Sequence, residues 1–538
     1  MARKFTLTIL AIQIVVAVLV PASAQQQELS RERYLDKLKG AWAGQMMGVT
    51  FGWPYEFVSN AKPILDELKP WSPERIAGAI DQDDIYVEMT FLKALENHGL
   101  GITNEQAGRA FASTEYQLWH ANLFGRENTR RGIMPPMSGH PQYNQHADDI
   151  DYQIEADLIG IICPGLPQES NRLSEIFGRI MNYGDGLYGG MFVAAMYAAA
   201  YFEDNDVHAV INAGLAAIPE ESRYHAMITD VIQWHREEPS DWLAVWHKIE
   251  SKWQDDSDCL PGAALNIDAA LNGAYIVMGM LYGEGDFDKT IEIATRCGQD
   301  ADCNPSNAAG ILGCMKGYSA IDAKWTSGIA AVADKKFSYT DYSWNTLILA
   351  CERMTAAIVQ RLGGSVDENK FMIPVQAPQA PATLDVWPAD FGRTPVTNRD
   401  VEFWQAGWKL VACGTRMEPG YNDKEFGRRG ILRIHPVDEQ HPAAVEGEVS
   451  VPQTGNPRLT FDIASYKSWR NASIVGDFVL KIFVADQIVR DEPIDSPGKW
   501  VTIDVDLTPH AGKSVTVRIE VHSGKSRPAA YLDHVKVN

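Results

Sequence analysis

The sequence predicts a two-part protein, an all-α domain followed by an antiparallel β-sandwich. Apolar residues recur with a helical period through residues 30–362. From about residue 398 onward they alternate with polar residues, which is the period of a strand. A Pro-rich stretch separates the two parts, and a chain of 538 residues is too long for one ordinary domain.

The composition excludes several classes of protein. Hydrophobic residues make up 45% of the chain and charged residues 22%, so the chain is not mostly disordered. The formal net charge of −22 argues against a nucleic-acid partner, because such proteins need a basic face. Seven cysteines without a C-x-x-C spacing indicate neither a disulfide scaffold nor a zinc motif. Partial disulfide pairing stays open.

The first 24 residues are predicted to be a secretory signal peptide. Arg3 and Lys4 precede an apolar run over residues 5–20, and the small residues Ala22 and Ala24 follow. A membrane anchor is the alternative, but the run is shorter than the roughly 20 residues that a spanning helix needs. We therefore expect a secreted or periplasmic protein without a membrane span after cleavage.

Helices are predicted within residues 30–362 at 34–47, 85–95, 190–202, 262–282 and 306–318. Within this part, glycine recurs at every fourth position from Gly40 to Gly52. On a helix, the first of these glycines would share a face without side chains and would let another backbone approach closely. The Gly and Pro punctuation from Gly48 to Phe57 predicts a loop.

Residues 363–390 are predicted to be a semi-extended, Pro-rich linker, and residues 391–538 the β-sandwich. Alternating patterns predict strands at 458–466, 478–486, 500–507 and 514–522. The sandwich broadly resembles the galactose-binding-like modules of secreted carbohydrate enzymes. Aromatic rings suit sugar faces, although for most of its tryptophans we favour a place in the core. These tryptophans are Trp404, Trp408, Trp469 and Trp500.

The first candidate site is the acidic run Asp81-Gln82-Asp83-Asp84, directly before a predicted helix. Clustered carboxylates repel one another, so holding them together calls for a cation or the positive end of a helix. Asp is also a favoured capping residue, so simple capping is enough to explain this run when it is taken alone.

Asp300 and Asp302 form a second acidic pair before another predicted helix. Pro305 suits a first helical turn, which puts both carboxylates at the entrance of that helix. A cap in a solvated turn is the alternative, but Ala301, Cys303 and the apolar helix predict burial. Two carboxylate pairs at two buried helix entrances would form an oxygen-rich site for a hard cation such as Mg²⁺, Mn²⁺ or Ca²⁺.

Glu56 stands between Tyr55 and Phe57 and is a candidate acid or base, because an apolar setting raises the pKa of a carboxyl group. An ordinary loop glutamate is the alternative reading of this segment. The same choice arises for Glu155 and Asp157, which lie either beside the cation site or in a solvated cap.

Two histidines in the acidic segment 140–157 are expected to have no catalytic or metal-binding role. His140 and His146 do not form the H-x-x-x-H spacing that places two imidazoles on one helix face. We expect both to be structural or surface residues.

Together these segments resemble the ADP-ribosylglycohydrolase family, which includes the dinitrogen-reductase-activating glycohydrolases. The resemblance covers roughly residues 30–362, and the ordered set of motifs is more specific than any one of them. The motifs are the glycine-spaced helix with Pro54 and Glu56, the T-D-D-T run matched at Asp83 and Asp84, the G-N-G loop at Gly184-Asp185-Gly186, and the late D-T-D-T run matched at Asp300 and Asp302.

The resemblance implies an all-α bundle with one or two divalent ions, usually Mg²⁺ and otherwise Mn²⁺ or Ca²⁺, in a cleft. The implied metal ligands are Gln82, Asp83, Asp84, Asp300 and Asp302. The expected catalytic residues are Glu56, Asp84 and Asp300. The expected substrate contacts are Glu155, Asp157, Asp185 and Gly186.

The chain departs from the family pattern at three of these places. Gln82 and Cys303 replace threonines that bind metal in the family, and Asp185 replaces the asparagine of the middle loop. The amide oxygen of Gln82 can still bind a cation, whereas the thiol of Cys303 is a poor ligand for a hard one. Asp185 is a candidate to compensate for a lost ligand.

The predicted function is that of an exported, metal-dependent glycoside hydrolase acting on a carbohydrate or glycoconjugate, with a furanoside as the favoured sugar. One alternative is hydrolysis of ADP-ribosyl proteins or conjugates. Another is a non-catalytic sugar-binding protein, but four clustered carboxylates are costly without a cation.

Overall fold

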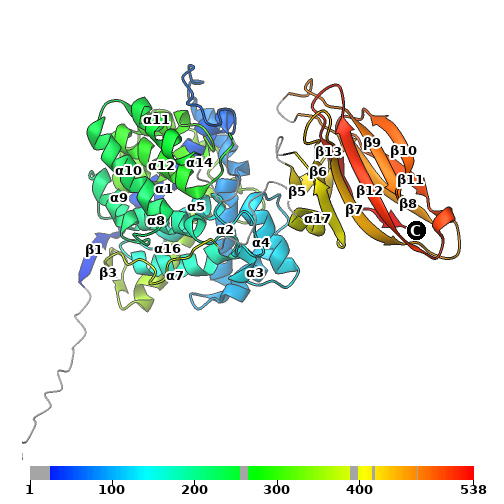
Figure 1. Ribbon diagram of the computed structural model, residues 1–538. Helices are drawn as coiled ribbons and strands as arrows, with labels where there is room; N and C mark the ends of the chain where they lie inside the picture. Colours follow the sequence, from blue (N-terminus) through cyan, green and yellow to red (C-terminus); the bar gives the residue numbers. More distant parts are fainter. Residues whose placement is uncertain (1–24, 255–263, 388–397, 415–418, 469–470) are drawn as a thin grey trace, which may run out of the picture.

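The computed structural model describes residues 25–254, 264–387, 398–414, 419–468 and 471–538. The predicted signal peptide lies outside these residues, as do Trp469 and the end of the predicted linker at 388–390. Figure 1 shows a helical domain with a β-sandwich beside it. The predicted fold class is therefore confirmed.

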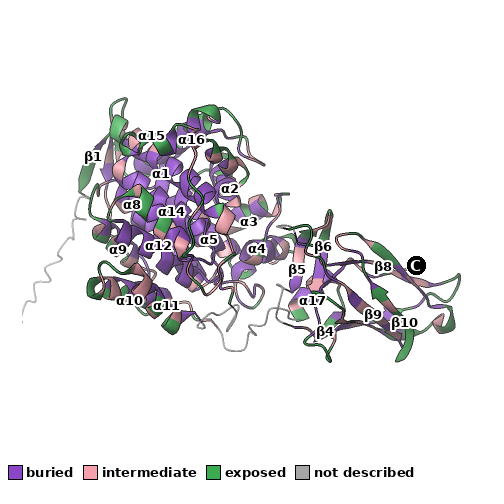
Figure 2. Ribbon diagram, turned by 90° about the horizontal axis from the view of Figure 1, so that it is seen from above, coloured by how far each residue is buried: buried purple, intermediate pink, exposed green. Residues whose placement is uncertain are grey.

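The helical domain begins with β1 (Gln26–Ser30) and α1 (Arg31–Gly52). Its other α-helices are α2 (Asp83–His98), α3 (Asn104–Ala112), α4 (His120–Arg130), α5 (Asp151–Glu155), α6 (Asp157–Ile161), α7 (Pro167–Phe177), α8 (Asp185–Ala200), α9 (Val207–Leu215), α10 (Arg223–Glu237), α11 (Trp242–Trp253), α12 (Ala269–Gly283), α13 (Phe287–Arg296), α14 (Cys303–Lys316), α15 (Ala323–Thr326) and α16 (Trp344–Arg361). Figure 2 shows that α1, α8, α12 and α14 are buried along most of their length. In the described part of the chain, no helix is both long and apolar enough to span a bilayer.

Helices α1 and α14 pack backbone against backbone. A Cβ atom on any of the four spaced glycines of α1 would lie 2.0–2.1 Å from a carbonyl oxygen in or just before α14. The pairs are Gly40 with Gly313, Gly44 with Ala309, Gly48 with Pro305 and Gly52 with Ala301. This contact, the glycine seam, extends α1 to Gly52, so the predicted start of a loop at Gly48 is wrong.

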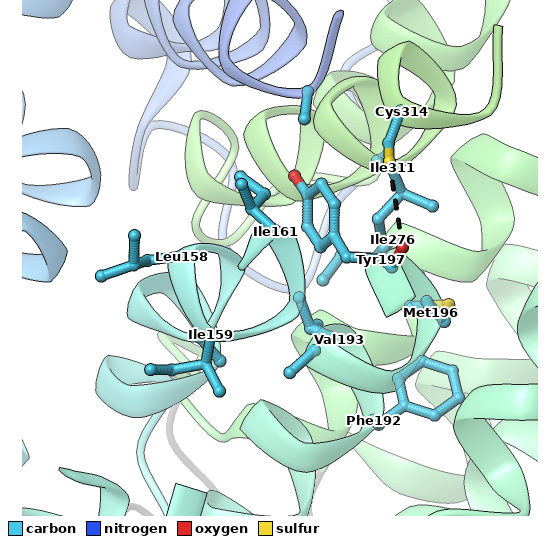
Figure 3. Close-up of a cluster of buried hydrophobic side chains, with 14 of the residues drawn as sticks. Leu158, Ile159, Ile161, Phe192, Val193, Met196, Tyr197, Ile276, Ile311 and Cys314 are labelled. Carbon is cyan, nitrogen blue, oxygen red and sulfur yellow. Dashed lines mark hydrogen bonds between the residues drawn. The ribbon is translucent and has the colours of Figure 1, made fainter. Parts of the chain in front are cut away.

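The hydrophobic core of the helical domain surrounds α8. Figure 3 shows Phe192, Val193, Met196 and Tyr197 of this helix beside apolar residues from α6, α12 and α14. The Cys314 thiol donates a hydrogen bond to the Tyr197 carbonyl at 3.8 Å. All six cysteines within the described residues are free thiols.

Two helix starts differ from the prediction. Helix α12 begins at Ala269 rather than 262, because the Asp268 carboxylate accepts the N–H groups of Ala270 and Leu271 and caps it there. Residues 255–263 lie outside the described chain. Helix α14 begins at Cys303 rather than 306, and Asp302 is its N-cap residue.

The predicted linker contains strands at its start. Strands β2 (Ser365–Val366) and β3 (Lys370–Pro374) pair antiparallel in a small sheet ordered β1-β3-β2. Phe371 and Ile373 are fully buried against the helical core, which explains why this segment is ordered. The linker prediction is therefore wrong for residues 365–374.

The C-terminal part begins with a short helix, α17 (Asn398–Trp404), and continues as two antiparallel sheets. One sheet has the order β10-β9-β12-β7-β4 and the other β11-β8-β13-β6-β5, with β14 beside β8. The strands are β4 (Trp408–Ala412), β5 (Gly420–Glu425), β6 (Arg428–Ile434), β7 (Ala443–Ser450), β8 (Arg458–Ser465), β9 (Phe478–Val484), β10 (Gln487–Ile494), β11 (Val501–Asp506), β12 (Ser514–Ser523), β13 (Ala530–Leu532) and β14 (Lys536–Val537). Trp404 and Trp408 are buried in this core, whereas Trp500 is partly exposed beneath the Arg428 guanidinium.

The sandwich packs against α4 and the loop that follows it, as Figures 1 and 2 show. The Arg126 guanidinium of α4 is fully buried and lies 2.9 Å from the Asp423 carboxylate of β5. The guanidinium of Arg131 lies 3.9 Å from the ring centre of Phe403 in α17. These contacts join the two domains directly.

We predict that Gly44→Ala destabilises the protein, because the added Cβ would lie 2.0 Å from the Ala309 carbonyl oxygen and would push α1 from α14. Overpacking of this kind costs about 1–3 kcal/mol, and backbone atoms cannot rotate away as side chains do. Gly101→Ala is the matched control, since no atom lies within 4 Å of its Cβ position. Thermal unfolding of the two variants measures the difference, and equal midpoints would contradict the seam.

Candidate functional site

The N-terminus of α2 forms the first part of the site. Gln82 is its N-cap residue, and the Gln82 carbonyl accepts the N–H groups of Ile85 and Tyr86 at 3.1 Å. The Gln82 side chain makes no capping hydrogen bond. Asp83 and Asp84 stand in the first turn, where the helix dipole stabilises carboxylates. The structure therefore places both aspartates at a helix entrance.

The approach to α14 forms the second part. The Asp302 carboxylate accepts the Cys303 N–H at 3.1 Å and caps the helix. The Asp300 carbonyl accepts the Asn304 N–H at 3.2 Å. Asn272 of α12 accepts the N–H of Asp300 at 3.4 Å, so the loop is also tied to a neighbouring helix. Both aspartate side chains are buried.

Cys303 joins the two helix entrances. Its thiol donates a hydrogen bond to Asp84 Oδ1 at 3.0 Å. Ligand atoms of Asp300, Asp302 and Cys303 lie within 4.8 Å of one another. Stretches more than 200 residues apart in the sequence are thus brought into one cluster, which we call the aspartate centre (Asp83, Asp84, Asp300, Asp302 and Cys303).

Burial and mutual repulsion dominate the electrostatics of this centre. Burial, followed by the charges of Asp302 and Asp83, raises the pKa of Asp84 well above its usual range. Burial and the charge of Asp300 do the same to the pKa of Asp302. Within the described residues, Asp84 Oδ2 and Asp300 Oδ1 are buried without a hydrogen-bond partner. Such oxygens destabilise the fold unless something positive meets them.

The residues of the aspartate centre fit a divalent cation. Four carboxylates supply the hard oxygen ligands that Mg²⁺, Mn²⁺ and Ca²⁺ prefer. The two unpartnered oxygens, on Asp84 and Asp300, belong to different helix entrances, so an ion between them would satisfy both. The Cys303 thiol would be the one soft group in this set.

Glu56 lies at the edge of the aspartate centre. It follows the short 3-10 helix η1 (Trp53–Tyr55) and is partly buried. The N–H of Phe57 donates to the Gln299 carbonyl at 3.0 Å, which fastens this loop to the approach to α14. The charge of Glu56 contributes to the raised pKa of Asp300, after burial and the charge of Asp84. The structure thus brings this predicted residue beside the predicted metal ligands.

Glu88 is a buried carboxylate that sequence reasoning missed. It follows Asp84 by four residues and therefore lies on the same face of α2, which is the pattern that could have identified it. The Leu158 N–H donates to Glu88 Oε2 at 2.6 Å. Burial and the charge of Asp157 raise the pKa of Glu88 well above its usual range.

Glu155 and Asp157 are both buried, which excludes the alternative that they lie in a solvated helix cap. Asn122 of α4 donates a hydrogen bond to Glu155. Asp157 accepts hydrogen bonds from Tyr197 and, at 2.5 Å, from Asn307 of α14. Burial raises the pKa of Asp157 to about 8, although both hydrogen bonds oppose the shift.

The middle loop opens α8, and its residues already have protein partners. The Asp185 carboxylate accepts Arg223 Nε at 3.1 Å and the Tyr224 N–H at 3.0 Å. Arg223 thus holds the group that we expected to compensate for a lost metal ligand. A Cβ on Gly186 would lie 2.4 Å from the Ala147 carbonyl oxygen, so the loop packs tightly there.

We predict that the metal-free protein loses stability as the pH rises from about 4 to about 8. In that window Asp157 keeps its proton in the folded state, whereas an unfolded aspartate, with a pKa of about 3.9, has lost it. Asp157→Asn should make this dependence less steep, because it removes one of the titrating groups and its amide can donate to Tyr197 and accept from Asn307. Chemical denaturation across this pH range measures the effect, with Asp66→Asn on an exposed loop as the control. Parallel pH profiles for Asp157→Asn and the native chain would contradict it.

Comparison with known proteins places this site in a family. The family model described as ADP-ribosylglycohydrolase matches residues 30–356. A solved structure titled "ADP-ribosylglycohydrolase-related protein complex" is 17% identical, with a TM-score of 0.41, and the match covers 60% of this chain and 99% of that one.

Other similarities concern smaller parts of the chain. CBM35 from Paenibacillus barcinonensis is 22% identical with a TM-score of 0.17, over 24% of this chain and 92% of that one. A CBM61 structure in complex with β-1,4-galactotriose is 15% identical with a TM-score of 0.19, over 27% of this chain and 99% of that one. No curated protein matches the sequence. Because the family model covers more than half of its residues, this chain belongs to the ADP-ribosylglycohydrolase family.

Proposed function

We propose that this protein is an exported glycoside hydrolase that depends on a divalent metal and cleaves a glycosidic bond, a furanoside in the first instance, in a glycan or glycoconjugate. The observation that carries the proposal is the convergence of two acidic helix entrances, linked by the hydrogen bond from Cys303 to Asp84. The family supports hydrolysis of a glycosyl bond.

The proposed mechanism assigns a task to each part of the site. Asp83, Asp84, Asp300 and Asp302 would hold Mg²⁺ or a similar ion, which when bound supplies a Lewis acid for a sugar hydroxyl or a water. Glu56, at the edge of these carboxylates, would take the proton from the attacking water. Burial raises the pKa of Glu155 well above its usual range, so in its neutral form it can donate a hydrogen bond to a sugar oxygen.

The charges around α8 favour an uncharged sugar over a diphosphate. Arg223 faces three carboxylates: it is paired with Asp185 and Asp268, and it lies 3.9 Å from Asp148. The Asp385 carboxylate is paired with Arg179, and it accepts the Gly184 N–H at 3.4 Å and so covers the start of α8. Helix N-termini are common phosphate sites, but here a phosphate would meet this carboxylate. This supports a glycan rather than an ADP-ribosyl group as the substrate.

Export is part of the proposal because residues 1–24 have the composition of a signal peptide. A secreted or periplasmic enzyme would meet extracellular glycans rather than ADP-ribosylated cytosolic proteins. Sequencing the N-terminus of the protein recovered from its native host tests this. Recovery outside the cytoplasm with a start near Gln25 is expected, and an intact N-terminus on cytoplasmic protein would contradict it.

We predict that Asp83→Ala and Asp300→Ala each reduce turnover at least about 100-fold, since even residues that only orient metal ligands are worth about 10–100-fold. Asp81→Ala is the matched control, because Asp81 is exposed and accepts a hydrogen bond from Ser338 outside the aspartate centre. Release of nitrophenol from furanosides and pyranosides, with Mg²⁺ or Mn²⁺ and after chelation, measures the effect. Full activity in both variants would refute the assignment.

The same assay separates the alternatives. Release from an ADP-ribosyl peptide alone would establish the activity for which the family is named and refute the glycan substrate. Binding of sugars without release from any substrate, with or without metal, would establish a non-catalytic sugar-binding protein.

A further inference from the structure

A second group of potential metal ligands lies outside the aspartate centre. His120 is the first residue of α4, and His146 and Asp149 lie in the loop before α5. Their ligand atoms all lie within 4.8 Å of one another. His120 and His146 are 26 positions apart in the printed sequence, which explains why no spacing motif identified them.

The geometry of this group is close to that of a metal site. The Nδ1 atoms of His146 and His120 lie 2.9 and 3.2 Å from the same oxygen, Asp149 Oδ2, and both imidazoles are hydrogen-bonded to this carboxylate. A bound ion would take the place of the shared protons. Ligand atoms around a tetrahedral zinc ion with bonds of about 2.0 Å are about 3.3 Å apart. An ion could therefore enter this group with only small shifts of the three side chains.

The burial of Asp149 is the second observation that points to a ligand. Its side chain is fully buried, and among the described residues its Oδ1 has no hydrogen-bond partner. The side chains of His120 and His146 are 27% and 14% exposed. A buried anionic oxygen behind two imidazoles that reach solvent gives an ion an entry path.

The backbone around Asp149 is rigidly placed. Its N–H donates to the His146 carbonyl at 2.9 Å, and its own carbonyl accepts Asn182 Nδ2 at 2.7 Å. Such contacts fix a ligand in place before an ion arrives, which lowers the cost of assembling the site.

We propose that His120, His146 and Asp149 form a second metal site, selective for Zn²⁺ and similar ions. Two imidazole nitrogens and one carboxylate suit Zn²⁺ or Co²⁺, whereas Mg²⁺ prefers oxygen ligands. The bound ion joins the start of α4 to the loop that leads into α5. Asp151 is the first residue of α5, and its Oδ1 accepts the Asn122 N–H at 2.9 Å. The Asn122 side chain in turn donates to Glu155. The site would therefore order the helices on one side of the aspartate centre.

The test is direct metal binding by the full chain after removal of metal with a chelator. Zn²⁺ is titrated calorimetrically, and Co²⁺ is followed by its visible absorption. His146→Gln and Asp149→Asn should each weaken the binding of one ion at least about 100-fold, as expected when a ligand rather than its support is lost. His140→Gln is the matched control, because His140 lies on the same segment but packs against Tyr183.

Two further results bear on the proposal. A Co²⁺ spectrum of this site should lack a thiolate charge-transfer band, which an ion at Cys303 would produce. Unchanged zinc stoichiometry and affinity in both variants would overturn the proposal, as would loss of zinc in Asp300→Asn alone. If circular dichroism shows that either variant is unfolded, His120→Gln, on the most exposed of the three side chains, replaces it. Because binding is the readout, the result does not depend on the proposed glycosidase activity.

Discussion

The contact between the backbones of α1 and α14 is the constraint on which the site depends. Its four glycines face carbonyl oxygens of α14 and its approach, and the last pair, Gly52 with Ala301, lies at the aspartate centre itself. Ala301 stands between Asp300 and Asp302, and η1 and Glu56 follow Gly52 directly. The seam therefore sets the position of the second aspartate pair and of the loop that carries Glu56, so a change in its packing would move Asp300, Asp302 and Glu56 together.

This arrangement buries many carboxyl groups close to one another. The carboxylates of the aspartate centre, Glu88, Glu155 and Asp157 are buried together, and burial raises their pKa values. Among the described residues, no basic side chain is among the main causes of these pKa shifts. Protonation and hydrogen bonds to Asn122, Asn307 and Tyr197 relieve part of the repulsion. A bound cation would reduce this repulsion further. Metal binding would therefore raise the stability of the folded protein.

The two-domain fold and the aspartate pairs could be predicted from the sequence because each is marked by a local pattern. The glycine spacing, the acidic residues at helix starts and the alternation after residue 398 each depend on near neighbours in the chain. The group around Asp149 could not be predicted because His120 and His146 lie on segments that only the fold brings together, whereas the spacing of Glu88 from Asp84 on one helix was a local signal that was not used. The strands at 365–374 were missed because the flanking glycines and prolines hid a buried Phe371 and Ile373. Asp185 could be aligned with the asparagine of the family's middle loop, but its partner Arg223 could be identified only from the structure.

The ion pair between Arg126 and Asp423 has a mechanical consequence. Both side chains are enclosed at the boundary between the domains, and Phe124 and Phe403 lie beside each other there with ring centres 4.9 Å apart. Separation of the sandwich from the helical domain would break the buried ion pair between Arg126 and Asp423 and would expose the rings of Phe124 and Phe403 to solvent. These contacts hold the sandwich against the helical domain. Any polymer bound on the surface of the sandwich would therefore lie at a fixed distance and in a fixed orientation relative to the aspartate centre.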